Sequence, residues 1–234
     1  MREQGPLPED YFEDEIKSKP PSLSWRLFKT TIAILIVGGL VYLSGVHQIF
    51  FYKRTPVDIS QGPLEEALDT EAILVPITVF ILRSNGVYGS ERDVDDVRHL
   101  IELASNIWNQ ANVSLRIDRI VKKELDEGEI ELLWNDVDEF VALFDEYDDG
   151  HINVFLVSSL RGINGVAFTG LQSLAVADYT SVYDFRVLAH EVGHILGLNH
   201  VPENRGRLMY RGANGVELSL EEIIRAREFA LEFR

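Results

Sequence analysis

The sequence contains no cysteine, which excludes several kinds of chemistry at once. Disulfide bonds, thiolate metal sites and a thiol nucleophile all require that residue. Positive charge is also scarce: 22 lysine and arginine residues stand against 38 aspartate and glutamate residues, a formal net charge of −16. A protein this acidic is unsuited to binding the phosphate backbone, so we expect no nucleic-acid partner.

Long apolar runs are rare too, with one exception near the N-terminus. Residues 1–29 are polar, charged and proline-bearing, which predicts a flexible tail. Residues 30–52 then contain no Asp, Glu, Lys or Arg. At about 1.5 Å per residue, a helix of this length crosses a hydrocarbon core about 30 Å thick. We therefore expect an uncleaved transmembrane anchor over 30–52.

A buried core helix and a cleaved signal peptide are the alternatives for this run. A core helix would carry a polar face, and a signal peptide would have a shorter apolar region before a small-x-small cleavage site. More basic residues precede the run than follow it. The positive-inside rule then predicts a single-pass protein of the cell membrane, with the tail in the cytoplasm and the following domain on the outer side.

Residues 53–71 read as a stalk, because proline and glycine punctuate a polar stretch. Residues 72–234 should form one folded domain. Apolar periodicity predicts helices at 92–111, 137–144, 183–198 and 219–233, the last with a capping box of Ser219 and Glu222. It predicts strands at 72–82, 113–121, 152–157, 165–168 and 173–178, and leaves 124–131 as a charged face or loop. This order indicates an α+β fold with a mixed, mostly parallel sheet.

Three histidines near the end of the domain have the spacing of a metal site. His190 and His194 are four residues apart, so on a helix they lie on one face, one turn apart. Gly197 permits a positive φ, which lets the helix end and the chain turn so that His200 reaches the same point. Three neutral imidazoles suit one Zn²⁺ ion and leave a fourth position open, as a catalytic site requires.

Glu191 follows the first of these histidines and can reach a metal-bound water without being a ligand. Zinc held in this way lowers the pKa of its bound water to about 7. As general base, Glu191 would take the proton of that water and pass it to the leaving amine nitrogen of a peptide bond. The short HExxH pattern alone also fits a solvated histidine pair beside a glutamate. The further glycine and third histidine, at the end of an apolar helix, favour the zinc site.

The segment from His190 to His200 resembles the zinc-binding signature of the metzincin metalloproteases. Leu208-Met209-Tyr210 resembles their Met-turn, most closely that of matrix metalloproteinases, which implies that Met209 supports the ligands from beneath. The resemblance extends over 72–234 and implies a metzincin-like catalytic domain with an active-site helix and a C-terminal helix. The function it implies is a zinc metalloendopeptidase that acts on peptide or protein substrates.

The same resemblance identifies candidates for an edge strand that pairs with an extended substrate, namely Gly165, Val166, Ala167 and Phe168. Ordinary sheet residues fit this stretch equally well. Arg211 stands where astacin-like members carry an additional tyrosine ligand, so no such ligand is expected. Without cysteine, latency through a propeptide thiolate is excluded. Val201 follows the third histidine where several subfamilies carry a polar residue, so the subfamily stays open.

The remaining titratable residues are not assigned to the site. We expect His99 to be solvated and His151 to have a role in its loop. Ca²⁺ could bind a nearby acidic cluster, but its spacing is not that of a defined calcium loop, which favours a solvated turn at Asp145, Glu146, Asp148 and Asp149. The alternative function is a catalytically inactive, membrane-tethered zinc-binding interaction module of the same fold. Glu191 favours the enzyme, since an inactive module has no use for a general base.

Overall fold

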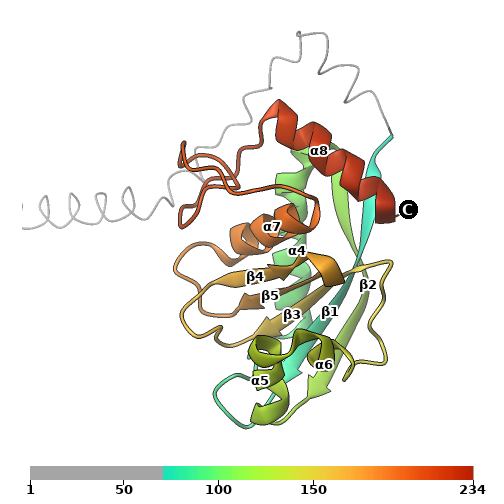
Figure 1. The fold of residues 1–234 in the computed structure, drawn as a ribbon, viewed down its shortest axis with the longest axis vertical. Coiled ribbons are helices and arrows are strands. Elements are labelled where there is room, and N and C mark those ends of the chain that lie inside the picture. Colours follow the sequence, from blue (N-terminus) through green and yellow to red (C-terminus); the bar gives the residue numbers. More distant parts are fainter. Residues whose placement is uncertain (1–70, 234) are drawn as a thin grey trace, which may run out of the picture. The chain divides into compact units, whose positions relative to one another are not determined.

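The apolar runs of the domain form one five-stranded sheet in the computed structural model, which describes residues 71–233 (Figure 1). The order across the sheet is β2-β1-β3-β5-β4, and only β4 runs antiparallel to its neighbour. The strands are β1 (Ile73–Arg83), β2 (Val113–Glu124), β3 (Ile152–Val157), β4 (Gly165–Phe168) and β5 (Ser173–Ala177). The predicted α+β class with a mostly parallel sheet is confirmed.

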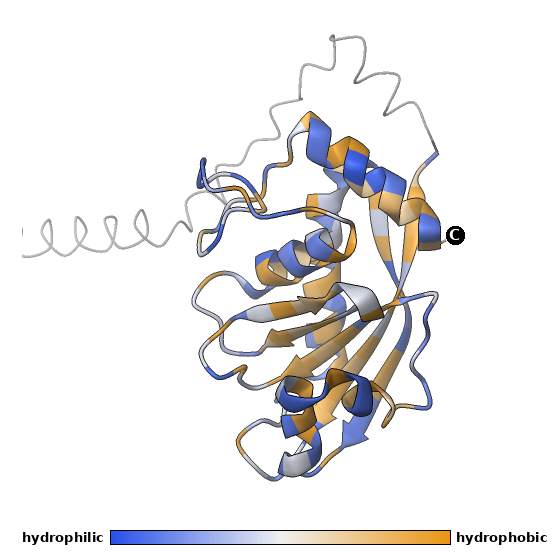
Figure 2. Ribbon diagram, in the orientation of Figure 1, coloured by the Kyte–Doolittle hydropathy of each residue, from blue (hydrophilic) through white to orange (hydrophobic). Residues whose placement is uncertain are grey.

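Helices lie on both sides of this sheet, so the domain has two apolar cores (Figures 1 and 2). Alternate residues of β1 enter each core, because successive side chains of a strand point to opposite faces. The larger core packs α4 (Val94–Trp108), α7 (Asp184–Ile195) and α8 (Leu220–Ala230). The smaller core packs α5 (Glu127–Asn135) and α6 (Val137–Val141). Single turns of 3-10 helix complete the fold at η1 (Asn109–Ala111), η2 (Thr169–Leu171) and η3 (Leu231–Phe233).

Four phenylalanine side chains pack together within the smaller core. Phe80 stacks on Phe155 with ring centroids 5.0 Å apart, and Phe140 and Phe144 meet the same ring at 4.9 and 5.0 Å. All four side chains are buried. Because this core lies on the face of the sheet opposite α7, it supports the sheet without contributing to the histidine site.

Helix α5 corrects one prediction, since residues 124–131 were expected to be a charged face or loop. Asp126 accepts from the Glu129 amide and Glu129 accepts from the Asp126 amide, which closes a capping box at the start of the helix. Only Ile130 and Leu133 are buried. Two apolar positions are too few to produce a helical period in the sequence, so capping rather than periodicity marks this helix.

The two edge strands of the sheet differ in their side chains. β4 reads Gly-Val-Ala-Phe without a charge and packs beside α7. Charged side chains along an edge discourage pairing with another chain. β2 carries such side chains, exposed at Arg116, Asp118, Arg119 and Lys122. The sheet is therefore protected at β2 and open at β4.

The remaining predictions concern the N-terminal segments, two histidines and the last helix. The predicted tail at 1–29, membrane span at 30–52 and nearly all of the stalk at 53–71 lie outside it. Across residues 71–233, no helix is long and apolar enough to cross a membrane. His99 is exposed, whereas His151 is largely buried and its Nδ1 lies 2.8 Å from Thr78 Oγ1. The capping box of Ser219 and Glu222 begins α8 as predicted.

Candidate metal centre

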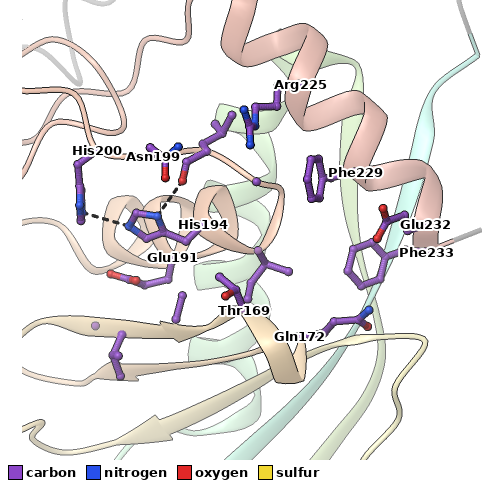
Figure 3. Close-up of a pocket in the computed structure, with 16 residues that line it drawn as sticks. Thr169, Gln172, Glu191, His194, Asn199, His200, Arg225, Phe229, Glu232 and Phe233 are labelled. Atoms are coloured by element: carbon purple, nitrogen blue, oxygen red, sulfur yellow. Dashed lines mark hydrogen bonds between the residues drawn. The ribbon is translucent and has the colours of Figure 1, made fainter.

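The structure brings the three histidines together at the C-terminal half of α7 and the turn that follows it. Figure 3 shows two of them, His194 and His200. His190 Nε2 and His194 Nε2 lie 3.0 and 3.1 Å from His200 Nε2. The candidate ligand atoms all lie within 4.8 Å of one another, and no other group of histidine and carboxylate side chains in residues 71–233 does so. Three nitrogens at about 2.0–2.1 Å from one tetrahedral ion have this spacing, so the side chains present fit zinc.

Main-chain carbonyls orient two of the rings. His190 Nδ1 donates to the Leu208 carbonyl at 2.7 Å, and His194 Nδ1 donates to the Leu198 carbonyl at 2.9 Å. A carbonyl can only accept, so the proton of each neutral ring is on Nδ1. The Nε2 lone pairs of both rings are then free for a metal, the usual arrangement of histidine ligands.

His200 has a different partner. Its Nδ1 lies 3.1 Å from Nε and 2.9 Å from Nη2 of Arg211. A guanidinium only donates, so Nδ1 is the acceptor in this contact. A neutral ring that gives its Nε2 lone pair to a metal carries its proton on Nδ1 instead. Arg211 therefore opposes the proton arrangement in which His200 is a ligand.

Burial favours the neutral form of the side chains at this centre. It lowers the pKa of His190 to about 3, that of His200 to about 4, and that of His194 below its usual value. All three imidazoles are neutral at neutral pH, the form that binds metal. Burial also raises the pKa of Glu191 to about 7, although the charge of Arg186 opposes this shift. The Glu191 side chain is only 7% exposed.

Strand β4 approaches α7 at Gly165, directly against Glu191. A Cβ atom at Gly165 would lie 2.7 Å from Val187 Cγ1, 2.9 Å from Glu191 Cγ and 3.0 Å from Glu191 Oε1. Only glycine allows the strand to lie this close to the carboxylate. Gly165, Val166 and Ala167 border a cavity beside the histidines, and Phe168 does not. Val166 and Phe168 both pack against the smaller core. The first three predicted edge-strand residues are thus at the site, and the fourth points elsewhere.

Met209 lies beneath the helix that carries the first two histidines. It is fully buried, and a Cβ atom at Gly193 would lie 2.6 Å from Met209 Sδ. The indole of Trp108 closes the same space, with its Cζ2 at 3.6 Å from that Cβ position. Gly193, which the sequence shows only as an unspecified position of the motif, is therefore required by the packing of Met209.

The chain turns after α7 in a Schellman motif around Gly197. The Leu198 amide donates to the Gly193 carbonyl at 2.8 Å, and the Gly197 amide donates to the His194 carbonyl at 3.1 Å. Gly197 has a φ of 75°, a conformation that favours glycine. The ring of Phe229 packs onto it, and a Cβ atom there would lie 2.6 Å from Phe229 Cε2. Helix α8 thus holds the turn that leads to His200.

Arg186 is a site residue that the sequence analysis missed. It is 3% exposed, and its guanidinium donates to the carbonyls of Leu208, Tyr210 and Gly215. Burial lowers its pKa to about 10, so it stays charged at neutral pH. The Leu208 carbonyl also accepts from His190. Arg186 thus holds the segment that orients His190. The sequence feature that could have indicated this role is an arginine four residues before His190 on the same predicted helix.

A cavity of about 680 Å³ opens beside Glu191 and His194 (Figure 3). Strand β4 and η2 form one side of it. The C-terminal helix and η3 form another side, with residues that the sequence analysis did not assign to the site: Arg225, Phe229, Glu232 and Phe233. The cavity therefore joins the metal centre to the end of the domain.

No protein-family model matches the chain, and no curated protein matches it either. Among solved structures, it is similar to a zinc-dependent peptidase from Methanocorpusculum labreanum at 20% identity, covering 68% of this chain and 100% of that one with a TM-score of 0.36. It is similar to an archaemetzincin from Methanopyrus kandleri at 15% identity, covering 71% and 97% with a TM-score of 0.41. A chain from a chaperone–substrate complex is 18% identical, with 70% and 36% covered and a TM-score of 0.43. These values are low, so a function has to rest on the chain's own residues.

Proposed function

We propose that the chain is a zinc-dependent endopeptidase with His190, His194 and His200 as the zinc ligands. The observation that carries the proposal is the convergence of three neutral imidazoles beside a buried carboxylate, Glu191, on the wall of an open cavity. Structural zinc sites are closed by four ligands, whereas a catalytic site keeps one position open. Three ligands facing a cavity support the catalytic type.

Glu191 is the general base in this proposal. A zinc ion at the three imidazoles would supply Lewis-acid activation of the nucleophile and of the scissile carbonyl. The Glu191 carboxylate borders the cavity beside the imidazoles, so it is placed to accept a proton from the attacking water and to return it to the leaving amine nitrogen. Its contact with Gly165 holds the carboxylate at the cavity wall.

Strand β4 is the element that would align a substrate. It is an edge strand, paired with β5 on one side only, and three of its four residues border the cavity. An extended peptide can add to such an edge through main-chain hydrogen bonds, which do not depend on its sequence. This arrangement supports cleavage within a chain and gives the reason for proposing an endopeptidase.

The test is cleavage of a chemically unfolded protein by the full-length chain loaded with zinc, with the fragments identified by mass spectrometry. The Glu191→Gln variant should lose about 10²–10⁴-fold in rate while it still binds one equivalent of zinc. The matched control is Glu228→Gln, which changes an exposed glutamate of α8 and should cleave like wild type. A chelator-treated sample should be inactive.

Three other results would contradict parts of this proposal. Undiminished cleavage by Glu191→Gln would remove this residue from the mechanism. Zinc binding without cleavage would favour the inactive, tethered interaction module. Failure to bind zinc would exclude the metal centre itself.

We also propose that residues 30–52 anchor the chain in the cell membrane, with the domain on the outer side. The support is the uncharged apolar run and the excess of basic residues before it. Full-length protein should sediment with membranes and resist alkaline extraction, and a protease added to intact cells should digest the domain. Deletion of 30–52 should release it. Alkaline extraction of the full-length chain would contradict the anchor.

A further inference from the structure

The cavity extends from the metal centre in one direction, towards the C-terminal helix (Figure 3). Phe229 of α8 and Phe233 of η3 present aromatic rings to it, and Ile195 and Leu198 add aliphatic surface near the histidines. Phe229 is half-buried and fixed by its contact with Gly197. A preformed apolar wall beside reactive groups is typical of a site that binds a large side chain.

Arg225 adds a positive charge to the same wall. It lies one helical turn before Phe229, and its guanidinium carbon is 5.7 Å from the Phe229 ring centroid. Among residues 71–233, no carboxylate forms an ion pair with Arg225. Glu232, which also borders the cavity, lies beside Phe233 at the far end from Arg225 (Figure 3). The charge of Arg225 is therefore available to a carboxylate of a ligand.

The spacing of these groups matches that of an extended peptide. Residues four apart on a helix have Cβ atoms about 5–6 Å apart. Alternate residues of a strand point to the same side and lie about 6.6 Å apart. Two peptide side chains separated by one residue can therefore face Arg225 and Phe229 together. A cavity of about 680 Å³ has room for such a segment on one side of the scissile bond.

We propose that this cavity is the specificity subsite and that it selects peptides in which an acidic residue and a large apolar residue are separated by one position. The apolar side chain packs against Phe229 and Phe233, and the carboxylate pairs with Arg225. The identity of the ligand as a peptide rests on the proposed function. The C-terminal helix is then part of the substrate site.

The test measures peptide binding separately from cleavage. Zinc-loaded full-length Glu191→Gln protein is titrated into fluorescent peptides that carry Glu-x-Phe, Lys-x-Phe or Glu-x-Ala in an otherwise constant sequence, each in both orders. We expect Glu-x-Phe in one order to bind about tenfold more tightly than Lys-x-Phe, from attraction to the arginine, and about tenfold more tightly than Glu-x-Ala, from apolar burial.

Two further variants on the same background test the residues. Arg225→Glu should reverse the preference between the Glu and Lys peptides, whereas Arg98→Glu, the same change at an exposed position of α4, should leave it intact. Thr169→Trp places a large ring at an exposed residue of the cavity wall and should weaken every peptide about tenfold, with zinc binding unchanged.

The outcomes separate this inference from the proposed function. An unchanged Glu-to-Lys preference in Arg225→Glu, or no measurable binding of any peptide, overturns the subsite even if wild type cleaves proteins. The expected preferences, found with a wild-type protein that cleaves none of the peptides, support the subsite and count against the protease.

Discussion

Replacing Glu191 with glutamine should make the metal-free protein increasingly stable relative to wild type as the pH rises from about 4 to 8. The residue Glu191 is 7% exposed, and no group among the described residues forms a hydrogen bond with its carboxylate. Burial raises its pKa from 4.5 to about 7. In the unfolded chain this group ionises with a pKa of 4.5, whereas in the folded chain it stays protonated until about pH 7. The unfavourable contribution therefore grows as the pH rises through this window and is constant above it.

The pKa difference sets the size of the effect. One pKa unit corresponds to about 1.4 kcal/mol, so ionisation of Glu191 removes about 3 kcal/mol of stability at pH 7 and above. Glutamine has nearly the same shape and does not ionise. It adds an offset for its own buried amide, but that offset does not change with pH. The quantity to compare is therefore the pH-dependent part of the stability difference between the two proteins.

Urea unfolding of chelator-treated full-length protein, followed by tryptophan fluorescence, measures this quantity. The stability of Glu191→Gln relative to wild type should increase by about 3 kcal/mol between about pH 4 and pH 8. Glu228→Gln, at an exposed position, should show no such trend. A stability difference for Glu191→Gln that stays constant over this range would refute the claim that burial makes ionisation of the Glu191 carboxylate unfavourable.

Three further predictions concern the surroundings of the site. Gly193→Ala should destabilise the fold by about 1–3 kcal/mol because its methyl group meets Met209 Sδ at 2.6 Å. In urea unfolding, adding Met209→Ala should relieve part of this loss, and strictly additive losses of stability in the double variant would contradict the contact. Gly165→Ala, whose methyl group would lie 2.7 Å from Val187 Cγ1 and 3.0 Å from Glu191 Oε1, should reduce peptide cleavage about tenfold or more with zinc affinity unchanged. Wild-type rates would show that the close approach of β4 to α7 is dispensable. Arg211→Gln offers His200 Nδ1 an acceptor in place of a donor, so the affinity for zinc should rise about tenfold, as measured by competition with a chelator. Weaker zinc binding would mean that Arg211 supports His200 as a ligand.

The local part of the site could be predicted from the sequence because its geometry follows from helix periodicity. His190 and His194 lie on one face of α7 since they are four residues apart, and a glycine with positive φ turns the chain at Gly197. Main-chain conformation over a single segment decides both features.

The non-local part could not be predicted in this way. Phe229 packs onto Gly197 from a helix some thirty residues later in the sequence, and Arg186 holds carbonyls of a segment whose path is not encoded in any period. Gly165 and Gly193 are required by Glu191 and Met209, which approach them only in the folded domain. Side-chain packing between separate elements determines these four contacts, and pattern analysis of one segment does not detect it. Helix α5 was missed for the related reason that it buries just two residues.

The unequal edges of the sheet affect how the protein behaves at high concentration. Strand β2 carries exposed charged side chains, whereas β4 presents an uncharged edge at the cavity. The same open edge can pair with the β4 strand of another molecule, as exposed strands do in aggregation. Mutual repulsion between chains of formal charge −16 opposes such pairing over a Debye length of about 8 Å at physiological salt. Colloidal stability should therefore decline as salt rises or as the pH approaches the isoelectric point, and self-association should begin at β4.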